Sequence, residues 1–447
     1  MRLIHPLIIS LFCAASALAQ TEEKKIDAII GDKLKPDQPG MVVLAVKDNK
    51  VIYRKAFGMA NLEHKVPMTS GMVFEIGSIT KQFTAAAILM LYEQKKLGLD
   101  DDITKFIPDY PVHGHKITIQ HLLTHTSGIK SYTSMEDFSK VWRKDYKPVE
   151  FLDFFKNQPM DFATGEKWSY NNSGYFLLGV IIEKISGIPY AQFIEDNIFK
   201  PLGMSSSYFG SQSKIIPFRA SGYQGDATKG FVNAEYLSLT IPYAAGSLMS
   251  NVDDLLKWNQ ALWSNKVLKK ETLDKATTAY LLNNGKSTRY GFGFGLDEIS
   301  GSKTIEHSGG IFGYLTNGIY LPQENVLVLA LANCNCLTPQ ELSTLIAASM
   351  IGKPHSNPAM INVDEATLKS YAGKYITEEG PFNVTVENGQ LSYSGGGPAN
   401  KIYPYADRKF FKKDSFVTIE FTSDAGAIAG LTYKDRGMTV EARKVKE

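Results

Sequence analysis

The sequence predicts a mixed α/β (α+β) fold, in which helices flank an antiparallel sheet, followed by a small all-β domain at the C-terminus. Strand-like segments lie at both ends of the larger region, at residues 41–57 and at about 313–332, and helical segments lie between them. This arrangement favours one antiparallel sheet built from distant parts of the chain. Beyond about residue 363 only short alternating runs follow, which are typical of an all-β domain.

The elements of the larger region follow in order from local patterns. Two strands separated by a polar turn at 47–50 open it. Helices are predicted at about 78–96, 175–186 and 253–263. The first of these carries apolar residues nearly all round, which indicates a buried helix. Two further strands, at about 313–321 and 326–332, are separated by a turn that contains proline and asparagine.

The length of 447 residues is too great for one ordinary core, so two domains are expected. A linker is suggested where glycine, proline and polar residues gather at 352–358. The predicted organisation is a signal peptide at 1–19, a large domain at 20–350, a linker at 351–362 and a small β-barrel-like domain at 363–447.

The N-terminus has the pattern of a secretory signal. Arg2 supplies the charge, residues 7–17 the apolar run, and Ala17-Leu18-Ala19 the small-residue cleavage site before Gln20. The apolar run is too short to span a bilayer, and no later segment has the length and apolar character to do so. We therefore expect an exported protein, periplasmic or secreted, that is cut after Ala19 and has no membrane span.

The composition is that of a folded globular protein, with 44% hydrophobic and 21% charged residues. A net charge of +2 gives no electrostatic reason to expect binding to nucleic acid or to an anionic membrane. Beyond the predicted signal only Cys334 and Cys336 remain. On the predicted strand they would point to opposite faces, so we expect two buried thiols and no structural disulfide.

The pattern Ser-x-x-Lys occurs three times, at Ser78–Lys81, Ser211–Lys214 and Ser300–Lys303. Only the first begins a helix, where side chains three positions apart share a face and the lysine lies beside the hydroxyl. The helix N-terminus also favours negative charge that develops on that oxygen. The alternative interpretation is an N-cap serine and a surface lysine.

Two later motifs complement the first. Tyr170-Asn171-Asn172 offers a phenol that can move protons, and His307-Ser308-Gly309-Gly310 offers a histidine followed by backbone that a substrate can approach closely. Alone, Tyr170 could be a core residue and His307 an interior histidine. Because the three motifs supply different roles, together they predict an acyl-transfer site.

Four histidines, His113, His115, His121 and His125, lie close together in sequence, and the last two have the i, i+4 spacing of helical metal ligands. They lack the intervening glutamate of a zinc protease motif. We interpret them as structural, and expect neither a metal site nor a cofactor.

Over roughly residues 25–350 the chain resembles the serine β-lactamase and penicillin-binding-protein superfamily, particularly the branch of class C β-lactamases, DD-peptidases and related esterases. The resemblance is carried by Ser78-Ile79-Thr80-Lys81, residues 122–128 (LLTHTSG), 170–175 (YNNSGY), 201–204 (PLGM), Ala245-Gly246-Ser247 and His307-Ser308-Gly309. It implies a β-lactamase/transpeptidase-like antiparallel sheet flanked by helices. The segment Tyr371-Ala372-Gly373-Lys374-Tyr375 resembles the start of the lipocalin-like modules attached to such hydrolases.

The resemblance also implies roles for the motif residues. Ser78 would attack a carbonyl to form an acyl-enzyme, with Lys81 and Tyr170 relaying its proton; which of the two is the base stays open. Asn172 would position substrate and lysine, and His307, Ser308 and Gly309 would border the substrate. The backbone N–H groups of Ser78 and Gly310 would form the oxyanion hole.

The sequence departs from the β-lactamase pattern at His307, where those enzymes usually have lysine. A histidine is mostly neutral at pH 7.5, so we expect weak dependence on a substrate carboxylate. The predicted function is an exported serine hydrolase that cleaves peptide, amide or ester bonds, as a DD-peptidase, D-amino-acid peptidase or esterase. A β-lactamase and a catalytically silent penicillin- or peptidoglycan-binding protein are the alternatives. The predicted partner is a small-molecule or peptide substrate with a reactive carbonyl, and the oligomeric state is left open.

Overall fold

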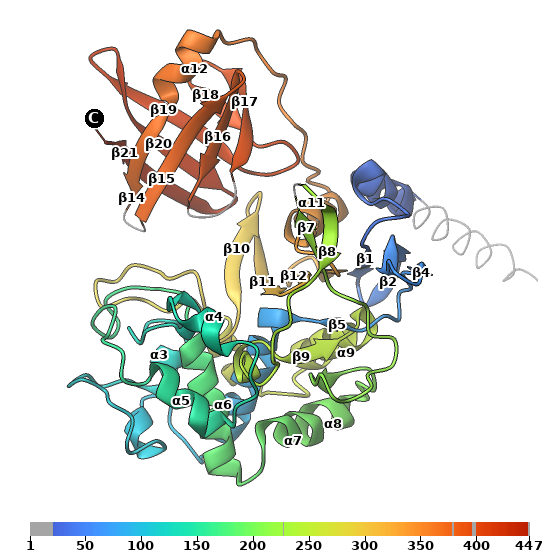
Figure 1. Ribbon diagram of the computed structural model, residues 1–447, viewed down its shortest axis with the longest axis vertical. Coiled ribbons are helices and arrows are strands. Elements are labelled where there is room, and N and C mark those ends of the chain that lie inside the picture. The colour runs from blue at the N-terminus through green and yellow to red at the C-terminus, as the bar shows by residue number, and fades with distance from the viewer. Residues whose placement is uncertain (1–20, 227, 378–379, 396–398, 446–447) are drawn as a thin grey trace, which may run out of the picture. The chain divides into compact units, whose positions relative to one another are not determined.

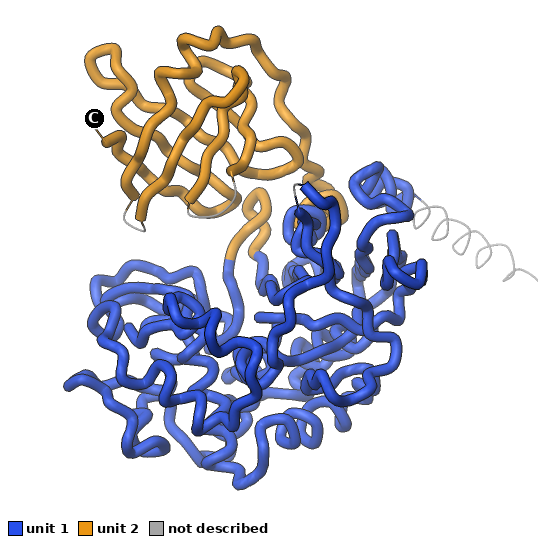
Figure 2. The backbone as a smooth tube through the Cα atoms, viewed as in Figure 1, with its two compact units in different colours: residues 1–296, 304–343 blue, residues 297–303, 344–447 orange. Residues whose placement is uncertain are grey.

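The computed structural model describes residues 21–226, 228–377, 380–395 and 399–445. The predicted signal peptide therefore lies outside the described residues. The chain divides into two compact units (Figure 2). The first comprises residues 1–296 and 304–343, and the second residues 297–303 and 344–447.

A six-stranded sheet, most of whose residues belong to the larger unit, forms the centre of that unit (Figure 1). Its strands, in spatial order, are β10 (Gly295–Ile299), β11 (Ser302–Ile311), β12 (Tyr314–Leu321), β13 (Val326–Ala332), β1 (Met41–Lys47) and β2 (Lys50–Phe57). The first and last parts of the unit meet where β1 pairs antiparallel with β13, with Met41 opposite Ala332. The predicted α+β class, with one sheet made from distant segments, is confirmed.

Helices accompany this sheet, and the longest are apolar enough to be largely buried. They are α2 (Thr80–Glu93), α3 (Ile119–Leu123), α4 (Phe138–Val141), α5 (Pro148–Phe155), α6 (Asn172–Ser186), α7 (Tyr190–Ile194), α8 (Lys200–Leu202), α9 (Val252–Trp263), α10 (Lys270–Ala276) and α11 (Pro339–Met350). Short 3-10 and π turns lie at Gly31–Lys33, Gly77–Ile79, Ile103–Lys105, Tyr132–Ser134, Glu195–Phe199 and Tyr243–Ala245. Helix α2 is buried on most of its surface, as its sequence indicates.

A small three-stranded sheet leads the chain into the N-terminus of α2. It has the order β5 (Phe74–Glu75), β9 (Leu248–Ser250) and β6 (Tyr208–Phe209). Two further pairs are β3 (Met59–Asn61) with β4 (Val66–Pro67), and β7 (Tyr223–Asp226) with β8 (Gly230–Asn233).

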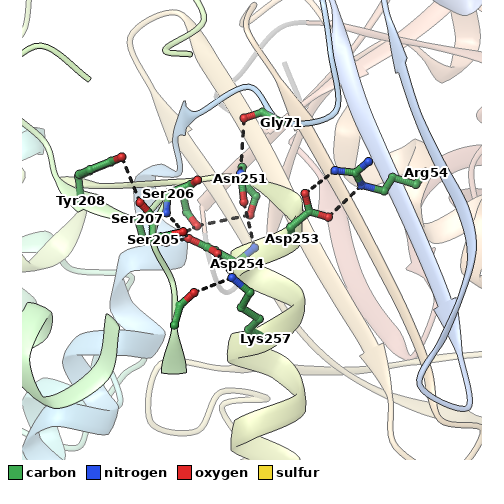
Figure 3. A network of polar contacts seen from close by, with 12 residues as sticks. Arg54, Gly71, Ser205, Ser206, Ser207, Tyr208, Asn251, Asp253, Asp254 and Lys257 are labelled. Atoms are coloured by element: carbon green, nitrogen blue, oxygen red, sulfur yellow. Dashed lines mark hydrogen bonds and ion pairs between the residues drawn. The ribbon is translucent and has the colours of Figure 1, made fainter. Parts of the chain in front are cut away.

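A buried carboxylate ties α9 to the segment that leads into β6 (Figure 3). Asn251 caps the helix by accepting from the backbone N–H of Asp254 at 2.9 Å. The Asp254 carboxylate, 2% exposed, accepts from the N–H of Ser206 at 2.7 Å and from the hydroxyl of Ser207 at 3.0 Å. It also pairs with Lys257 at 2.8 Å. Because three donors stabilise this buried charge, it holds the start of α9 to the Ser206–Ser207 segment, a connection called the Asp254 tether below.

The second unit contains a closed barrel of strands β14 to β21 (Figure 1). The strands are β14 (Gly373–Thr377), β15 (Gly380–Glu387), β16 (Gln390–Ser394), β17 (Asn400–Ala406), β18 (Lys409–Phe411), β19 (Thr418–Asp424), β20 (Ala427–Asp435) and β21 (Met438–Lys444). Helix α12 (Glu365–Tyr371) precedes them. The barrel interior is an aromatic and aliphatic core that includes Tyr371, Phe410 and Phe421. The predicted all-β C-terminal domain is confirmed.

The expectation of two unpaired thiols is wrong, because Cys334 and Cys336 form a disulfide. Strand β13 ends at Ala332, and Cys336 lies in a turn rather than on the strand. The turn brings the two Cα atoms to 5.2 Å, within the range that a disulfide spans.

Within the described residues, no single helix has both the length and the apolar character needed to cross a bilayer. Helices Asn172–Ser186 and Tyr190–Leu202 meet that criterion only when taken together, and they are bent by 79° relative to each other.

Candidate active site

Ser78 lies in the short turn Gly77–Ile79, between β5 and α2. Two glycines let strand β11 approach this turn. A Cβ atom on Gly77, whose φ is +51°, would lie 2.9 Å from the backbone nitrogen of Gly310, and one on Gly309 would lie 2.0 Å from the carbonyl oxygen of Ile76. The lack of side chains at both positions therefore brings the backbone around Ser78 against the backbone around Gly310.

Lys81 sits one turn into the helix with its amine beside the Ser78 hydroxyl. Its Nζ lies 3.1 Å from Ser78 Oγ, 2.8 Å from Asn172 Oδ1 and 2.8 Å from the carbonyl oxygen of Ala245. The residue is fully buried, and burial holds the pKa of the amine well below its ordinary value. In the neutral amine, two N–H donors satisfy Asn172 and Ala245, which leaves the lone pair for the Ser78 proton.

The Tyr170 ring lies beside this amine. Lys81 Nζ is 4.7 Å from the centroid of the Tyr170 ring. Desolvation raises the pKa of the Tyr170 phenol, and a hydrogen bond with Ser78 lowers it. Because the residue is 36% exposed, water limits that rise. The phenol is therefore protonated at neutral pH and within reach of Ser78.

Asn172 is the first residue of α6, and its side chain is held by neighbours. Its Nδ2 donates to Thr133 Oγ1 at 3.1 Å, which turns Oδ1 toward Lys81. The preceding residue, Asn171, caps the helix by accepting from the N–H of Gly174 at 2.8 Å. The cap fixes the start of α6, and with it the position of the Tyr170-Asn171-Asn172 motif.

His307 lies on β11 with both ring nitrogens occupied. Its Nδ1 is 2.6 Å from the carbonyl oxygen of Ser308, and its Nε2 is 2.8 Å from the hydroxyl of Tyr290. Since a carbonyl only accepts, Nδ1 carries the proton and Nε2 accepts from Tyr290. Burial lowers the pKa of His307 to about 3. The ring is therefore neutral. It is also buried, whereas Ser308 and Gly310 on the same strand are exposed.

His125 belongs to this site, although its sequence predicted only a structural role. The ring, 1% exposed, packs against Tyr170, Tyr175 and Tyr290 at centroid distances of 4.4, 5.1 and 4.8 Å. Its Nδ1 accepts from the N–H of Asn171 at 3.1 Å, so the neutral ring carries its proton on Nε2. The backbone φ of +61° is unusual for a residue other than glycine. In the sequence, the LLTHTSG segment indicates that His125 belongs to a motif of the resembled superfamily. It does not predict that the His125 ring contacts Tyr170.

His121, which has the i, i+4 spacing with His125, has a hydrogen-bond partner at the start of its own helix. His121 Nδ1 lies 3.0 Å from Thr118 Oγ1, at the start of α3. Among the residues that the structure describes, no group of three or more His, Cys, Asp or Glu side chains is arranged to hold a metal ion.

A cavity of about 330 Å³ opens beside Ser78. Asn172, Gly246 and Gly310 border it together with Ser78. The structure therefore brings Ser78, Lys81, Tyr170 and Asn172 together, and places the backbone of Gly309 and Gly310 next to them. His307 is near the same group, with its ring centroid 6.1 Å from that of Tyr170, but its ring is buried.

Comparisons with known proteins identify the family to which this chain belongs. A family model described as Beta-lactamase matches residues 20–347. The chain belongs to the β-lactamase family. Penicillin-binding protein 4* of Bacillus subtilis is 31% identical over 456 residues, which cover 96% of this chain and 100% of that protein. The D-aminopeptidase of Gluconobacter oxydans is 25% identical over 78% of this chain and 65% of its own length.

Solved structures show the same β-lactamase fold. The octameric penicillin-binding protein homologue from Pyrococcus abyssi has a TM-score of 0.67 and 28% identity, over 94% of this chain and 99% of that one. The D-stereospecific amidohydrolase from Streptomyces sp. has a TM-score of 0.63 and 26% identity, over 75% of this chain and 99% of that one. The predicted superfamily is thus confirmed, and this β-lactamase-family chain is an enzyme of the serine hydrolase type.

Proposed function

We propose that this enzyme hydrolyses amide or ester bonds through an acyl-enzyme on Ser78. The observation that carries the proposal is the position of the buried Lys81 amine, 3.1 Å from Ser78 Oγ and fixed by Asn172 and Ala245. A lysine serves as a base only when its pKa is depressed, and burial has that effect here.

In the proposed reaction the neutral Lys81 amine accepts the Ser78 proton while Oγ bonds to the substrate carbonyl carbon. The negative charge that develops on the carbonyl oxygen would be stabilised by the N–H groups of Ser78 and Gly310. The proton then passes by way of the Tyr170 phenol to the leaving amine or alcohol as the C–N or C–O bond breaks. Water next attacks the acyl-enzyme, giving a free carboxylic acid and restoring the Ser78 hydroxyl.

Amide bonds on the carboxyl side of D-amino acids whose amino group is blocked are the first substrates to examine, because the cavity beside Ser78 has no acidic lining residue to pair with a free ammonium. The names of the D-aminopeptidase from Gluconobacter oxydans and the D-stereospecific amidohydrolase from Streptomyces sp. support this choice. The neutral, buried His307 ring supports weak dependence on a substrate carboxylate, unlike the charged lysine usual in β-lactamases.

The test is intact-protein mass spectrometry after exposure to a fluorophosphonate and to a penicillin, with Ser78→Ala as the control. We expect a fluorophosphonate adduct that maps to Ser78 and is absent from the variant. Slow or absent turnover of the penicillin is expected, whereas rapid hydrolysis would identify a β-lactamase. A variant that retains turnover of every cleaved compound would refute the acyl-enzyme on Ser78, and an adduct without turnover of any substrate would indicate a silent binding protein.

We also propose that the protein is exported, on the basis of the N-terminal Arg2, apolar run and Ala17-Leu18-Ala19 sequence. The measurement is the mass of the N-terminal peptide of the protein recovered from cells. A mature protein that begins at Gln20 is expected, and retention of Met1 in the recovered active enzyme would contradict export by cleavage.

A further inference from the structure

The cavity beside Ser78 is bordered by uncharged side chains. Among the fourteen described residues that line it, none is Asp, Glu, Lys, Arg or His. Most of its wall is apolar and comes from separate parts of the chain, including Phe138, Leu237, Ile241, Ile311, Phe312 and Leu315.

The polar part of the lining is neutral as well. It includes the side chains of Ser78, Tyr132, Thr133 and Asn172, with backbone at Gly246 and Gly310. These groups can form hydrogen bonds with a carbonyl or an amide. They place no full charge opposite a ligand.

Two basic side chains of the site, Lys81 and His307, do not line this cavity. The Lys81 amine is fully buried and has its polar partners in Ser78, Asn172 and Ala245. The His307 ring is 6% exposed and bonded to Tyr290 and to the backbone of Ser308. Neither side chain is presented to a substrate carboxylate, and none of the fourteen lining residues is an acid that could pair with a substrate ammonium.

We propose that this cavity selects acyl donors whose acyl group is neutral and apolar, and that it discriminates against acyl groups with a free carboxylate or a free ammonium. The proposal rests on the acyl-enzyme function proposed above. The substrate class is amides and esters of N-blocked apolar amino acids and of aliphatic or aromatic carboxylic acids. An isolated charge that enters an uncharged, largely apolar cavity loses its hydration without gaining a partner, which is unfavourable.

Three p-nitrophenyl esters of nearly equal size test the proposal. The butyrate has a terminal methyl group, the hemisuccinate a terminal carboxylate, and the 3-aminopropionate a terminal ammonium. We expect kcat/KM at pH 7.5 to be roughly ten- to hundredfold higher for the butyrate than for either charged ester. Background hydrolysis is measured with the Ser78→Ala variant. A charged ester that is cleaved as well as the butyrate would overturn the proposal.

A matched pair of variants locates the selection in the cavity wall. Ile311 lies at the end of β11 and is half-buried. Ile311→Lys is expected to raise the ratio of kcat/KM for hemisuccinate over butyrate by about tenfold, because it supplies a partner for the carboxylate. Ile311→Met keeps a neutral side chain of similar size and is expected to leave the ratio near that of the original enzyme. If the hemisuccinate-to-butyrate ratio is near one in the original enzyme and unchanged in both variants, this wall does not select against the carboxylate.

The outcomes separate this proposal from the one it rests on. If Ser78→Ala abolishes cleavage of all three esters but the charged esters are preferred, the cavity does not select neutral groups and the acyl-enzyme function stands. If Ser78→Ala leaves cleavage of the butyrate intact, the acyl-enzyme function itself fails.

Discussion

His125 holds the backbone on both sides of Tyr170 while its ring lies 4.4 Å, centroid to centroid, from the tyrosine ring. Its carbonyl oxygen accepts from the N–H of Ser169 at 3.0 Å, and its Nδ1 accepts from the N–H of Asn171 at 3.1 Å. A residue that holds both neighbours of Tyr170 and packs on its ring limits the movement of that ring. Precise placement of a proton-transfer group contributes strongly to rate.

Replacing His125 with Phe is therefore expected to act through Tyr170. The ring remains, but the Asn171 N–H loses its acceptor, and we expect kcat/KM to fall roughly ten- to hundredfold. His125→Asn, which retains an acceptor and tolerates a positive φ, should lose less. The check is a double-mutant cycle with Tyr170→Phe, in which the His125→Phe loss largely disappears. Losses that simply multiply would show that His125 does not act on Tyr170.

The buried Lys81 amine predicts a rate that rises with pH. Its pKa is lowered by burial, so the active neutral form accumulates as pH rises through a value well below 10.5. We expect kcat/KM for a neutral ester to increase and then level off. His307, whose pKa is near 3, stays neutral from pH 5 to 9 and contributes no step there.

The measurement for this prediction is a pH–rate profile from pH 5 to 9 for the original enzyme and for Lys81→Arg. Arginine stays charged throughout this range, so the variant should be slower by orders of magnitude and show no comparable rise. A profile that falls as pH increases would contradict the assignment of the neutral amine as the base.

Because the backbone of β11 at Gly309 lies against the Ser78 turn, we expect substitution of this glycine to reduce both activity and stability strongly. An added Cβ would lie 2.0 Å from the Ile76 carbonyl oxygen and 2.3 Å from Thr316 Oγ1, so Gly309→Ala must push β11 away from the Ser78 turn. We expect a loss of kcat/KM of about 10²-fold or more, comparable to the loss of an oxyanion-hole donor, together with a lower melting temperature. Gly71→Ala is the control, because a Cβ there meets nothing within 4 Å. Equal activities in the two variants would count against this packing.

Two adjacent aspartates at the start of α9 are expected to differ in their contribution to stability. Asp254 is 2% exposed and has three donors, so Asp254→Ala should lower the free energy of unfolding by about 2 to 4 kcal/mol. The side chains of Asp253 and its partner Arg54 are 38% and 40% exposed, so Asp253→Ala should cost about 0 to 1 kcal/mol. Urea unfolding of both variants gives the comparison, and similar losses would refute the Asp254 tether.

Much of the fold was predictable because local patterns and long-range patterns agree. The alternation and apolar content of residues 41–57 and 313–332 predicted strands in one sheet, and the structure pairs them with Met41 opposite Ala332. The helix that begins near Ser78 was predictable from its apolar surface, although it ends at Glu93, a few residues earlier than predicted. The roles assigned to Ser78, Lys81 and Tyr170 remain predictions, although the structure brings these residues together.

Other features depend on contacts that sequence patterns do not contain. The disulfide between Cys334 and Cys336 requires a strand that stops at Ala332, and strand ends are set by pairing partners rather than by the residues themselves. The contact of His125 with Tyr170 spans loops whose paths are fixed by the N-cap at Asn171 and by packing. The neutral state of His307 follows from its burial beside Tyr290, which lies on a different segment.

The pairing of β1 with β13 also governs the order of events during synthesis. The N–H of Gly40 bonds to the side chain of Asn333, 293 residues later. Strands β1 and β13 therefore cannot pair until the ribosome has released nearly the whole larger unit. Until then β1 can pair with β2, but its other edge, which pairs with β13, has no partner strand. Nascent chains truncated before residue 326 should therefore remain protease-sensitive and bind chaperones, and refolding of the complete chain should be slow, as topologies with distant contacts generally are.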